Sequence, residues 1–163
     1  YLERFRDAAT LAQEALTEAA EEYRTQFAPR LEPILKQSLA RVTRGRYVDA
    51  QVDPETLAVS LVAPELGRPV PVELLSAGTG DLVYLMLRMA IARVVSGGRE
   101  RLPLFLDDPM AQCDQERQEQ VLEYLALLAE ETQILLLTKD ELARAWFEST
   151  LNGQEAHALH LLN

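Results

Sequence analysis

Residues 74–81 read Leu-Leu-Ser-Ala-Gly-Thr-Gly-Asp, and residues 82–90 continue as Leu-Val-Tyr-Leu-Met-Leu-Arg-Met-Ala. A small, polar, glycine-bearing turn therefore opens a long apolar helix. The first turn of a helix has peptide N–H groups without helical partners, and the helix dipole adds partial positive charge there. With the hydroxyl of Ser76 beside these groups, the stretch predicts a phosphate-binding turn.

A second informative stretch follows downstream, where residues 102–109 read Leu-Pro-Leu-Phe-Leu-Asp-Asp-Pro. This pattern predicts an apolar strand that ends in two carboxylates, Asp107 and Asp108. Many nucleotide enzymes use a carboxylate at the end of such a strand to hold Mg²⁺ beside phosphates. In this order, the two stretches predict half of an ATP site.

Composition restricts the possible partners. The chain has 163 residues, a length that fits one domain, and a net charge of −10. Such an acidic surface repels DNA phosphates on average, so any DNA contact needs a local basic patch or another part of the molecule. The candidate patch is Lys36 with Arg41, Arg44 and Arg46, and the simpler alternative is a set of solvated charges near a helix end.

The same composition bears on the compartment. The single cysteine, Cys113, excludes an internal disulfide and fits a reducing, cytoplasmic environment. No apolar run reaches the roughly 18 residues of a membrane span. Because the chain starts at Tyr1 within a helical pattern, we expect it to be an excised fragment.

The first part of the chain predicts helices. Apolar residues recur at steps of three and four over residues 2–27, and we expect Pro29 to separate this helix from a second one over residues 34–43, which ends at Gly45. The first helix is either the root of a coiled coil or a helix packed on the domain. Its apolar stripe drifts instead of keeping strict heptads, which favours packing.

The remainder predicts an α/β fold with a mostly parallel sheet flanked by helices, because apolar strands alternate with helices. Residues 47–52 and 56–62 alternate in polarity around a turn at 53–55, which predicts an antiparallel hairpin. The further elements are helices at 80–95, 115–129 and 140–149 and strands at 104–106, 133–137 and 156–162. The histidines His157 and His160 fall in the last strand, where we expect structural roles.

The ordered motifs resemble the C-terminal lobe of an ABC-type ATPase head, of the branch that includes SMC proteins and SbcC-type repair ATPases. Residues 75–79 are similar to the ABC signature motif LSGGQ, and residues 85–88 to its helical continuation. Residues 104–108 are similar to Walker B, and residues 108–114 to its passage into the D-loop. Residues 45–47 also resemble the start of the C-terminal lobe in these proteins. The resemblance extends from about Ile34 to Leu162.

The resemblance implies roles for particular residues. Ser76, Ala77, Gly78 and Thr79 would contact the γ-phosphate of an ATP molecule held by a second head. The structural alternative is an N-cap serine followed by a turn glycine.

At the Walker B end, Asp107 would hold Mg²⁺, and Asp108 would be the catalytic carboxylate, where the family usually has Glu. Here the alternative is that the pair ends the strand and caps a helix. Asp114 would be the D-loop acid that contacts the second head, and it is also suited to cap the helix from Gln115; both roles are compatible.

Two departures from the family pattern stand out. The strand at 134–138 resembles the one before the switch histidine, but the chain continues with Lys139 and Asp140 and has no histidine there, so Thr138, Lys139 or Asp140 would have to act in its place. The Walker A pattern G-x-x-x-x-G-K-[ST] is also absent from the sequence. We therefore expect the lobe alone neither to hold ATP tightly nor to hydrolyse it.

These observations predict residues 1–27 to lead in from a coiled coil and residues 28–163 to form the C-terminal lobe of the head. Its expected partners are an N-terminal Walker A lobe of the same protein and a second head in an ATP-dependent dimer. We expect DNA as a partner of the complete protein but not of this acidic lobe by itself. The expected function is ATP hydrolysis that drives head engagement in DNA repair or chromosome maintenance. The alternatives are a non-catalytic ABC-like dimerisation or partner-binding module, and a stand-alone α/β domain whose motifs are coincidental.

Overall fold

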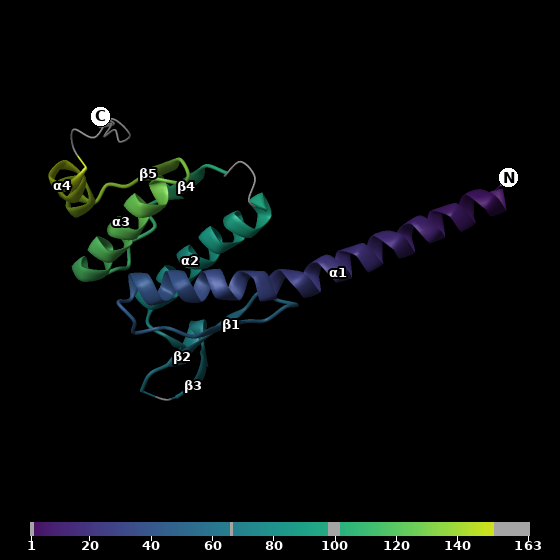
Figure 1. Ribbon diagram of the computed structural model, residues 1–163, viewed down its shortest axis with the longest axis horizontal. Helices are drawn as coiled ribbons and strands as arrows, with labels where there is room; N and C mark the ends of the chain where they lie inside the picture. Colours follow the sequence, from purple (N-terminus) through teal and green to yellow (C-terminus); the bar gives the residue numbers. More distant parts are fainter. Residues whose placement is uncertain (1, 66, 98–101, 152–163) are drawn as a thin grey trace.

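The computed structural model describes residues 2–65, 67–97 and 102–151 (Figure 1). Within these residues, four α-helices, one 3-10 helix and five strands form an α/β fold. They follow in the order α1 (Leu2–Val42), β1 (Ala50–Val52), β2 (Val59–Ala63), β3 (Arg68–Pro71), η1 (Val72–Leu74), α2 (Ala77–Ser96), β4 (Leu104–Asp107), α3 (Gln115–Ala129), β5 (Ile134–Leu137) and α4 (Glu141–Thr150). No helix in these ranges is both long enough and apolar enough to cross a membrane.

Helix α1 is a single helix of 41 residues, so the predicted break at Pro29 is wrong. Pro29 and Pro33 both lie inside it, four positions apart on one exposed face. Proline removes one helical hydrogen bond and crowds the preceding turn. On an exposed face, water can bind the carbonyl groups that lose a donor, while the opposite face stays packed.

The two halves of α1 have different surroundings. The side chains of residues 5–21 are exposed, and this half projects away from the other elements (Figure 1). The expectation that it packs on the domain is therefore wrong. Burial begins at Phe27 and Ala28, from where the second half of α1 contacts α2, α3 and β1.

The core lies where the second half of α1 meets α2. Leu31, Leu35, Leu39 and Val42 recur at helical spacing on α1 and are at most 1% exposed. The apolar helix α2 supplies fully buried partners such as Met86. Truncating a buried leucine of this kind to alanine typically costs about 2–5 kcal/mol, so this stripe fixes α1 against the rest of the fold.

The predicted hairpin is confirmed, although its strands are shorter than expected. Strands β1 and β2 are antiparallel, with Ala50 opposite Leu61 and Val52 opposite Val59. A third antiparallel strand, β3, pairs with β2 and was not predicted. It carries Pro69 and Pro71, which cannot donate to a sheet ladder and are tolerated here because β3 is an edge strand.

The parallel part of the fold is small within the described residues. Strands β4 and β5 are parallel, with Asp107 opposite Leu137, and form a separate two-stranded sheet. A mostly parallel sheet is therefore not seen among the described residues. The predicted turn at 152–153 and strand at 156–162, with His157 and His160, lie outside them.

The three helices predicted after the hairpin agree closely with the structure. The bounds of α3 are those predicted, α2 begins three residues earlier than expected at Ala77, and α4 begins one residue later at Glu141. Gly97 ends α2 in a left-handed conformation, with φ of 56°.

Candidate functional site

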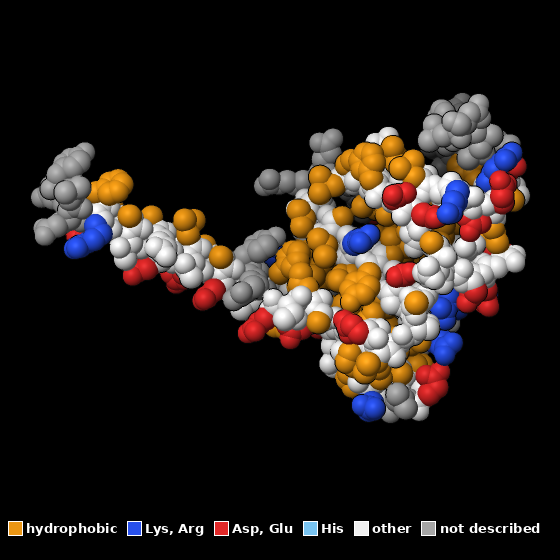
Figure 2. Space-filling view, turned by 180° about the vertical axis from the view of Figure 1, so that it is seen from behind, with side chains coloured by type: hydrophobic (Ala, Val, Ile, Leu, Met, Phe, Trp, Pro, Cys, Tyr) orange, Lys and Arg blue, Asp and Glu red, His pale blue; other side chains and the backbone are white. Residues whose placement is uncertain are grey.

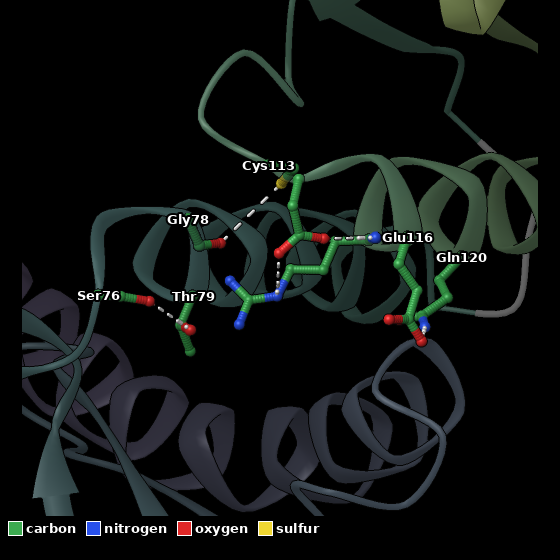
Figure 3. Close-up of polar contacts among 8 residues, drawn as sticks. Ser76, Gly78, Thr79, Cys113, Glu116 and Gln120 are labelled. Carbon is green, nitrogen blue, oxygen red and sulfur yellow. Dashed lines mark hydrogen bonds and ion pairs between the residues drawn. The ribbon is translucent and has the colours of Figure 1, made fainter.

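The turn at the start of α2 is held by its own polar groups. Ser76 is the N-cap residue, but its side chain makes no capping bond to the backbone. Its hydroxyl is instead 2.9 Å from the hydroxyl of Thr79 (Figure 3). The N–H groups of Thr79 and Gly80 both donate to the Ser76 carbonyl oxygen. The described residues offer no acceptor to the N–H groups of Ala77 and Gly78.

The accessibility of this turn differs from residue to residue. Ser76 and Ala77 are exposed, whereas Gly78 and Thr79 are buried. Ser76 and Ala77 are therefore the accessible residues of this turn.

Gly78 is packed against the segment that follows β4. A Cβ added at Gly78 would lie 2.6 Å from the carbonyl oxygen of Gln112 and 3.2 Å from a guanidinium nitrogen of Arg117. Real Cβ atoms do not approach a carbonyl oxygen so closely, so only glycine fits. The predicted signature turn and the predicted D-loop therefore touch within one chain.

Cys113 lies at the same contact. Its Sγ is 4.0 Å from the carbonyl oxygen of Gly78 (Figure 3). Burial raises the pKa of the Cys113 thiol, although the positive charge of Arg117 acts in the opposite direction. A thiol with a raised pKa is a poor nucleophile at neutral pH, which fits a packing role for this residue.

Asp114 is the N-cap of α3, as the structural alternative predicted. Its Oδ1 accepts the N–H of Arg117 at 2.9 Å, and its Oδ2 lies 3.6 Å from Nε of the same arginine. Asp114 remains largely exposed. The capping bond therefore leaves it accessible to another molecule.

The two consecutive carboxylates stand at the end of β4. Asp107 is the last residue of the strand and is exposed. Asp108 follows with a φ of 43°, a left-handed conformation that is uncommon for residues other than glycine. Its N–H donates to the carbonyl oxygen of Leu137 at 2.7 Å, which ties it to the end of β5.

The predicted switch segment meets the second of these carboxylates. The hydroxyl of Thr138 donates to Oδ1 of Asp108 at 2.9 Å. The same hydroxyl oxygen accepts the N–H of Asp140 at 3.1 Å. Lys139 lies between them and is exposed. Thr138 and Asp108 are therefore brought together, although 30 residues separate them in the sequence.

Asp140 has two structural bonds. Its Oδ1 accepts the N–H of Leu142, which caps α4, and its Oδ2 accepts the side-chain amide of Gln118 at 2.8 Å. Gln118 is buried and also lies 3.4 Å from the carbonyl oxygen of Met110. Gln118 was not predicted from the sequence. Its polar amide on the mainly apolar face of α3 was the one feature that could have indicated it.

The basic cluster is largely paired with acids. Lys36 lies 2.8 Å from Asp49, and their hydrogen bond raises the pKa of Lys36 and lowers that of Asp49. Arg44 lies 3.6 Å from Glu116, and Arg46 lies 3.1 Å from Glu65. This pairing favours the solvated-charge alternative over a phosphate-binding patch.

One face of the β4–β5 sheet is exposed and apolar. Phe105 is 70% exposed, Leu137 50% and Leu135 37%, and the register places Phe105 opposite Leu135. Hydrophobic side chains also gather over the globular part of the molecule in Figure 2. Adjacent exposed apolar side chains on a sheet are typical of a surface that packs against another element.

Within the described ranges, no group of three or more His, Cys, Asp or Glu side chains is arranged to hold a metal ion. Asp107 and Asp108 nevertheless supply carboxylate oxygens, the ligands that Mg²⁺ prefers. In nucleotide sites this ion takes one or two carboxylates and obtains its other ligands from phosphates and water. The donor set at the end of β4 therefore fits a Mg²⁺–nucleotide complex and does not by itself form a metal centre.

Comparison with known proteins identifies the fold. No protein-family model and no curated protein matches the sequence. One similar solved structure comes from work on the structural biochemistry of ATP-driven dimerization and DNA-stimulated activation of SMC ATPases. It aligns at a TM-score of 0.61 and 16% identity, over 77% of this chain and 76% of the other.

Two SMC head domains also align, over smaller shares of their own length. The Smc head domain with a coiled coil and joint from Pyrococcus yayanosii matches at a TM-score of 0.61 and 17% identity, over 88% of this chain and 28% of that one. The SMC head domain from Thermotoga maritima matches at a TM-score of 0.55 and 19% identity, over 71% of this chain and 40% of that one. The described residues therefore have an SMC ATPase head-like fold.

Proposed function

We propose that this chain is the C-terminal lobe of an SMC-like, ABC-type ATPase head. In this proposal, a Walker A lobe of the same protein completes the head, and two heads engage around ATP and Mg²⁺. The support is the head-like fold together with the order of the signature-like turn, the Walker B-like strand and the D-loop-like segment along the chain.

The observation that carries the proposal is the carboxylate pair at the end of β4, whose Asp108 is bonded to Thr138 after β5. Ligands of α/β proteins bind outside the carboxyl ends of parallel strands, and both segments lie at that edge. Asp107, exposed at the strand end, would hold Mg²⁺ directly or through water. Bound there, Mg²⁺ supplies positive charge to the phosphate oxygens.

Asp108 would orient the attacking water and accept its proton. Aspartate is one methylene shorter than the glutamate usual in the family. The left-handed backbone of Asp108 and its hydrogen bond to the Leu137 carbonyl fix where this shorter side chain begins.

The start of α2 would serve the second head. The N–H groups of Ala77 and Gly78 and the hydroxyl of Ser76 lie at the positive end of the helix dipole, a combination that suits a γ-phosphate. Gly78 packs against the D-loop-like segment. Ser76 and Asp114 would therefore contact a second head from one continuous surface.

The exposed face of β4 and β5, with Phe105, Leu135 and Leu137, would be covered by the Walker A lobe. The exposed half of α1 would pair with a second helix in a coiled coil. DNA would be bound by the complete protein in repair or chromosome maintenance, because three of the four basic side chains in the cluster of this acidic lobe are paired with acids.

ATP turnover by the complete protein tests this proposal. We expect hydrolysis that depends on Mg²⁺ and on the Walker A lobe. A non-catalytic dimerisation module is the competing proposal, favoured by Asp108 in place of glutamate and by Lys139 after Thr138 in place of histidine. Dimerisation with ATP but no turnover above background would favour that module.

A further inference from the structure

We propose that Thr138 is a positioning residue for Asp108 and does not sense the γ-phosphate. This inference rests on the proposed function, in which Asp108 orients the attacking water. It gives the residue before the missing switch histidine a role that the sequence pattern does not supply.

The direction of the hydrogen bonds supports this assignment. A threonine hydroxyl has one proton to donate and two lone pairs to accept with. The oxygen of Thr138 accepts the N–H of Asp140, and a carboxylate such as Asp108 can only accept. The single proton of Thr138 is therefore directed at Oδ1 of Asp108 and is not available to a phosphate oxygen.

Asp108 is held at both its backbone and its side chain. Its N–H donates to the carbonyl oxygen of Leu137, and its Oδ1 accepts from the next residue, Thr138. The described residues provide no hydrogen-bond donor to Oδ2 of Asp108. One carboxylate oxygen is thus fixed by Thr138, and the other remains available to a water molecule.

Thr138 is itself anchored to the interior. The N–H of Asp140 holds the hydroxyl, and the carboxylate of Asp140 is bound by the buried amide of Gln118 at 2.8 Å. A continuous path of hydrogen bonds therefore runs from α3 through Asp140 and Thr138 to Asp108. Gln118 is buried, so its side chain is held in place by packing. The path can therefore hold the Asp108 carboxylate in one orientation.

The experiment compares Thr138→Val and Thr138→Ser in the complete protein, with Thr132→Val as the matched control. Thr132, near the other end of β5, donates its hydroxyl to the Leu102 carbonyl at 2.8 Å, so the control removes a similar bond far along the strand. Steady-state ATP hydrolysis gives kcat and KM. Crystal structures of wild type and Thr138→Val give the orientation of the Asp108 carboxylate.

We expect Thr138→Val to lower kcat by about 10-fold to 100-fold, the scale of a misplacement near 1 Å, with KM within about threefold of wild type. Thr138→Ser, which keeps the hydroxyl, should retain most of kcat, and Thr132→Val should behave as wild type. In the Thr138→Val crystal, the Asp108 carboxylate should be rotated.

Wild-type kcat in Thr138→Val, or equal losses in Thr138→Val and Thr138→Ser, would overturn the inference. A large rise in KM with kcat unchanged would indicate phosphate sensing and would also overturn it. If wild type itself hydrolyses no ATP, the proposed function fails. The crystal structures then decide the positioning role separately, since an unmoved Asp108 carboxylate in Thr138→Val would contradict it.

Discussion

Gly78 and Gln112 lie so close that a single added carbon atom would not fit between them. A Cβ on Gly78 would stand 2.6 Å from the Gln112 carbonyl oxygen. The glycine of the signature-like turn therefore has a packing role within its own chain, in addition to the phosphate contact proposed for it.

Gly78→Ala should destabilise the fold. Overpacking typically costs about 1–3 kcal/mol, which outweighs the gain of up to about 1 kcal/mol from replacing a helical glycine with alanine. Gly80→Ala is the matched control in the same helical turn, since its Cβ would meet Val72 at an ordinary 3.7 Å. Urea unfolding should show the first variant less stable than wild type and the second slightly more stable. Equal midpoints for the two variants would contradict the packing role.

Ser76→Arg should block ATP-driven dimerisation of the complete protein and leave nucleotide binding intact. Ser76 is exposed at the start of α2, where the second head's phosphate would approach, and arginine fills that space. Size-exclusion chromatography with ATP should show dimerisation weakened at least about tenfold, or 1.4 kcal/mol. Ser76→Ala, which removes the bond to Thr79 without adding bulk, should still dimerise. If Ser76→Arg dimerises normally, Ser76 has only a structural role at the start of α2.

Asp108→Asn should reduce turnover by about 100-fold or more, as expected for loss of a general base. It should also trap the ATP-bound dimer, because in the proposed head Asp107 would still provide its carboxylate for Mg²⁺. Asn keeps a side-chain oxygen that can accept the Thr138 hydroxyl, so the surrounding structure should be retained. Turnover at the wild-type rate would instead assign Asp108 a structural role and make Lys139 and Asp140 the next residues to test.

The hairpin turn should make stability depend on pH. Oδ1 of Asp53 accepts the N–H groups of Glu55 and Thr56 and the hydroxyl of Thr56, and these bonds, led by the backbone bond from Thr56, lower the pKa of Asp53. A lowered pKa in the folded state adds stability above the unfolded pKa of about 3.9, which is lost as pH falls through the folded value.

The measurement is the free energy of unfolding between pH 7 and about pH 3. The gap between wild type and Asp53→Ala should be largest at neutral pH and shrink as the pH falls below about 4. Asp53→Asn keeps the accepting oxygen without a titratable charge, so its gap to Asp53→Ala should stay constant. A constant gap between wild type and Asp53→Ala would show that the charge of Asp53 does not stabilise the turn.

Elements with a clear local pattern were predictable from the sequence. Helix α3 begins at an aspartate cap and was placed correctly, and the alternating residues around Asp53 gave the hairpin. Local rules failed where packing decides the outcome. Pro29 and Pro33 do not break α1 because Leu31 and Leu35 hold the opposite face, and β3 tolerates Pro69 and Pro71 because it is an edge strand.

The candidate site was predictable as a set of residues but not as a set of contacts. The bond between Thr138 and Asp108 depends on the parallel pairing of β4 with β5, which joins residues far apart in the sequence. The contact of Gly78 with Gln112 and the bond of Gln118 to Asp140 arise in the same way from tertiary packing. No spacing along the chain indicates them.

Calorimetric titration with Mg²⁺ and ATP tests the central proposal most directly. It should be carried out on this chain alone and on the complete protein that contains a Walker A lobe. We expect the chain alone to bind no tighter than about 1 mM, a free energy of roughly 4 kcal/mol, and the complete protein to bind far more tightly. Micromolar binding to the chain alone, or no binding to the complete protein, would contradict the assignment of this chain as one lobe of a divided ATPase head.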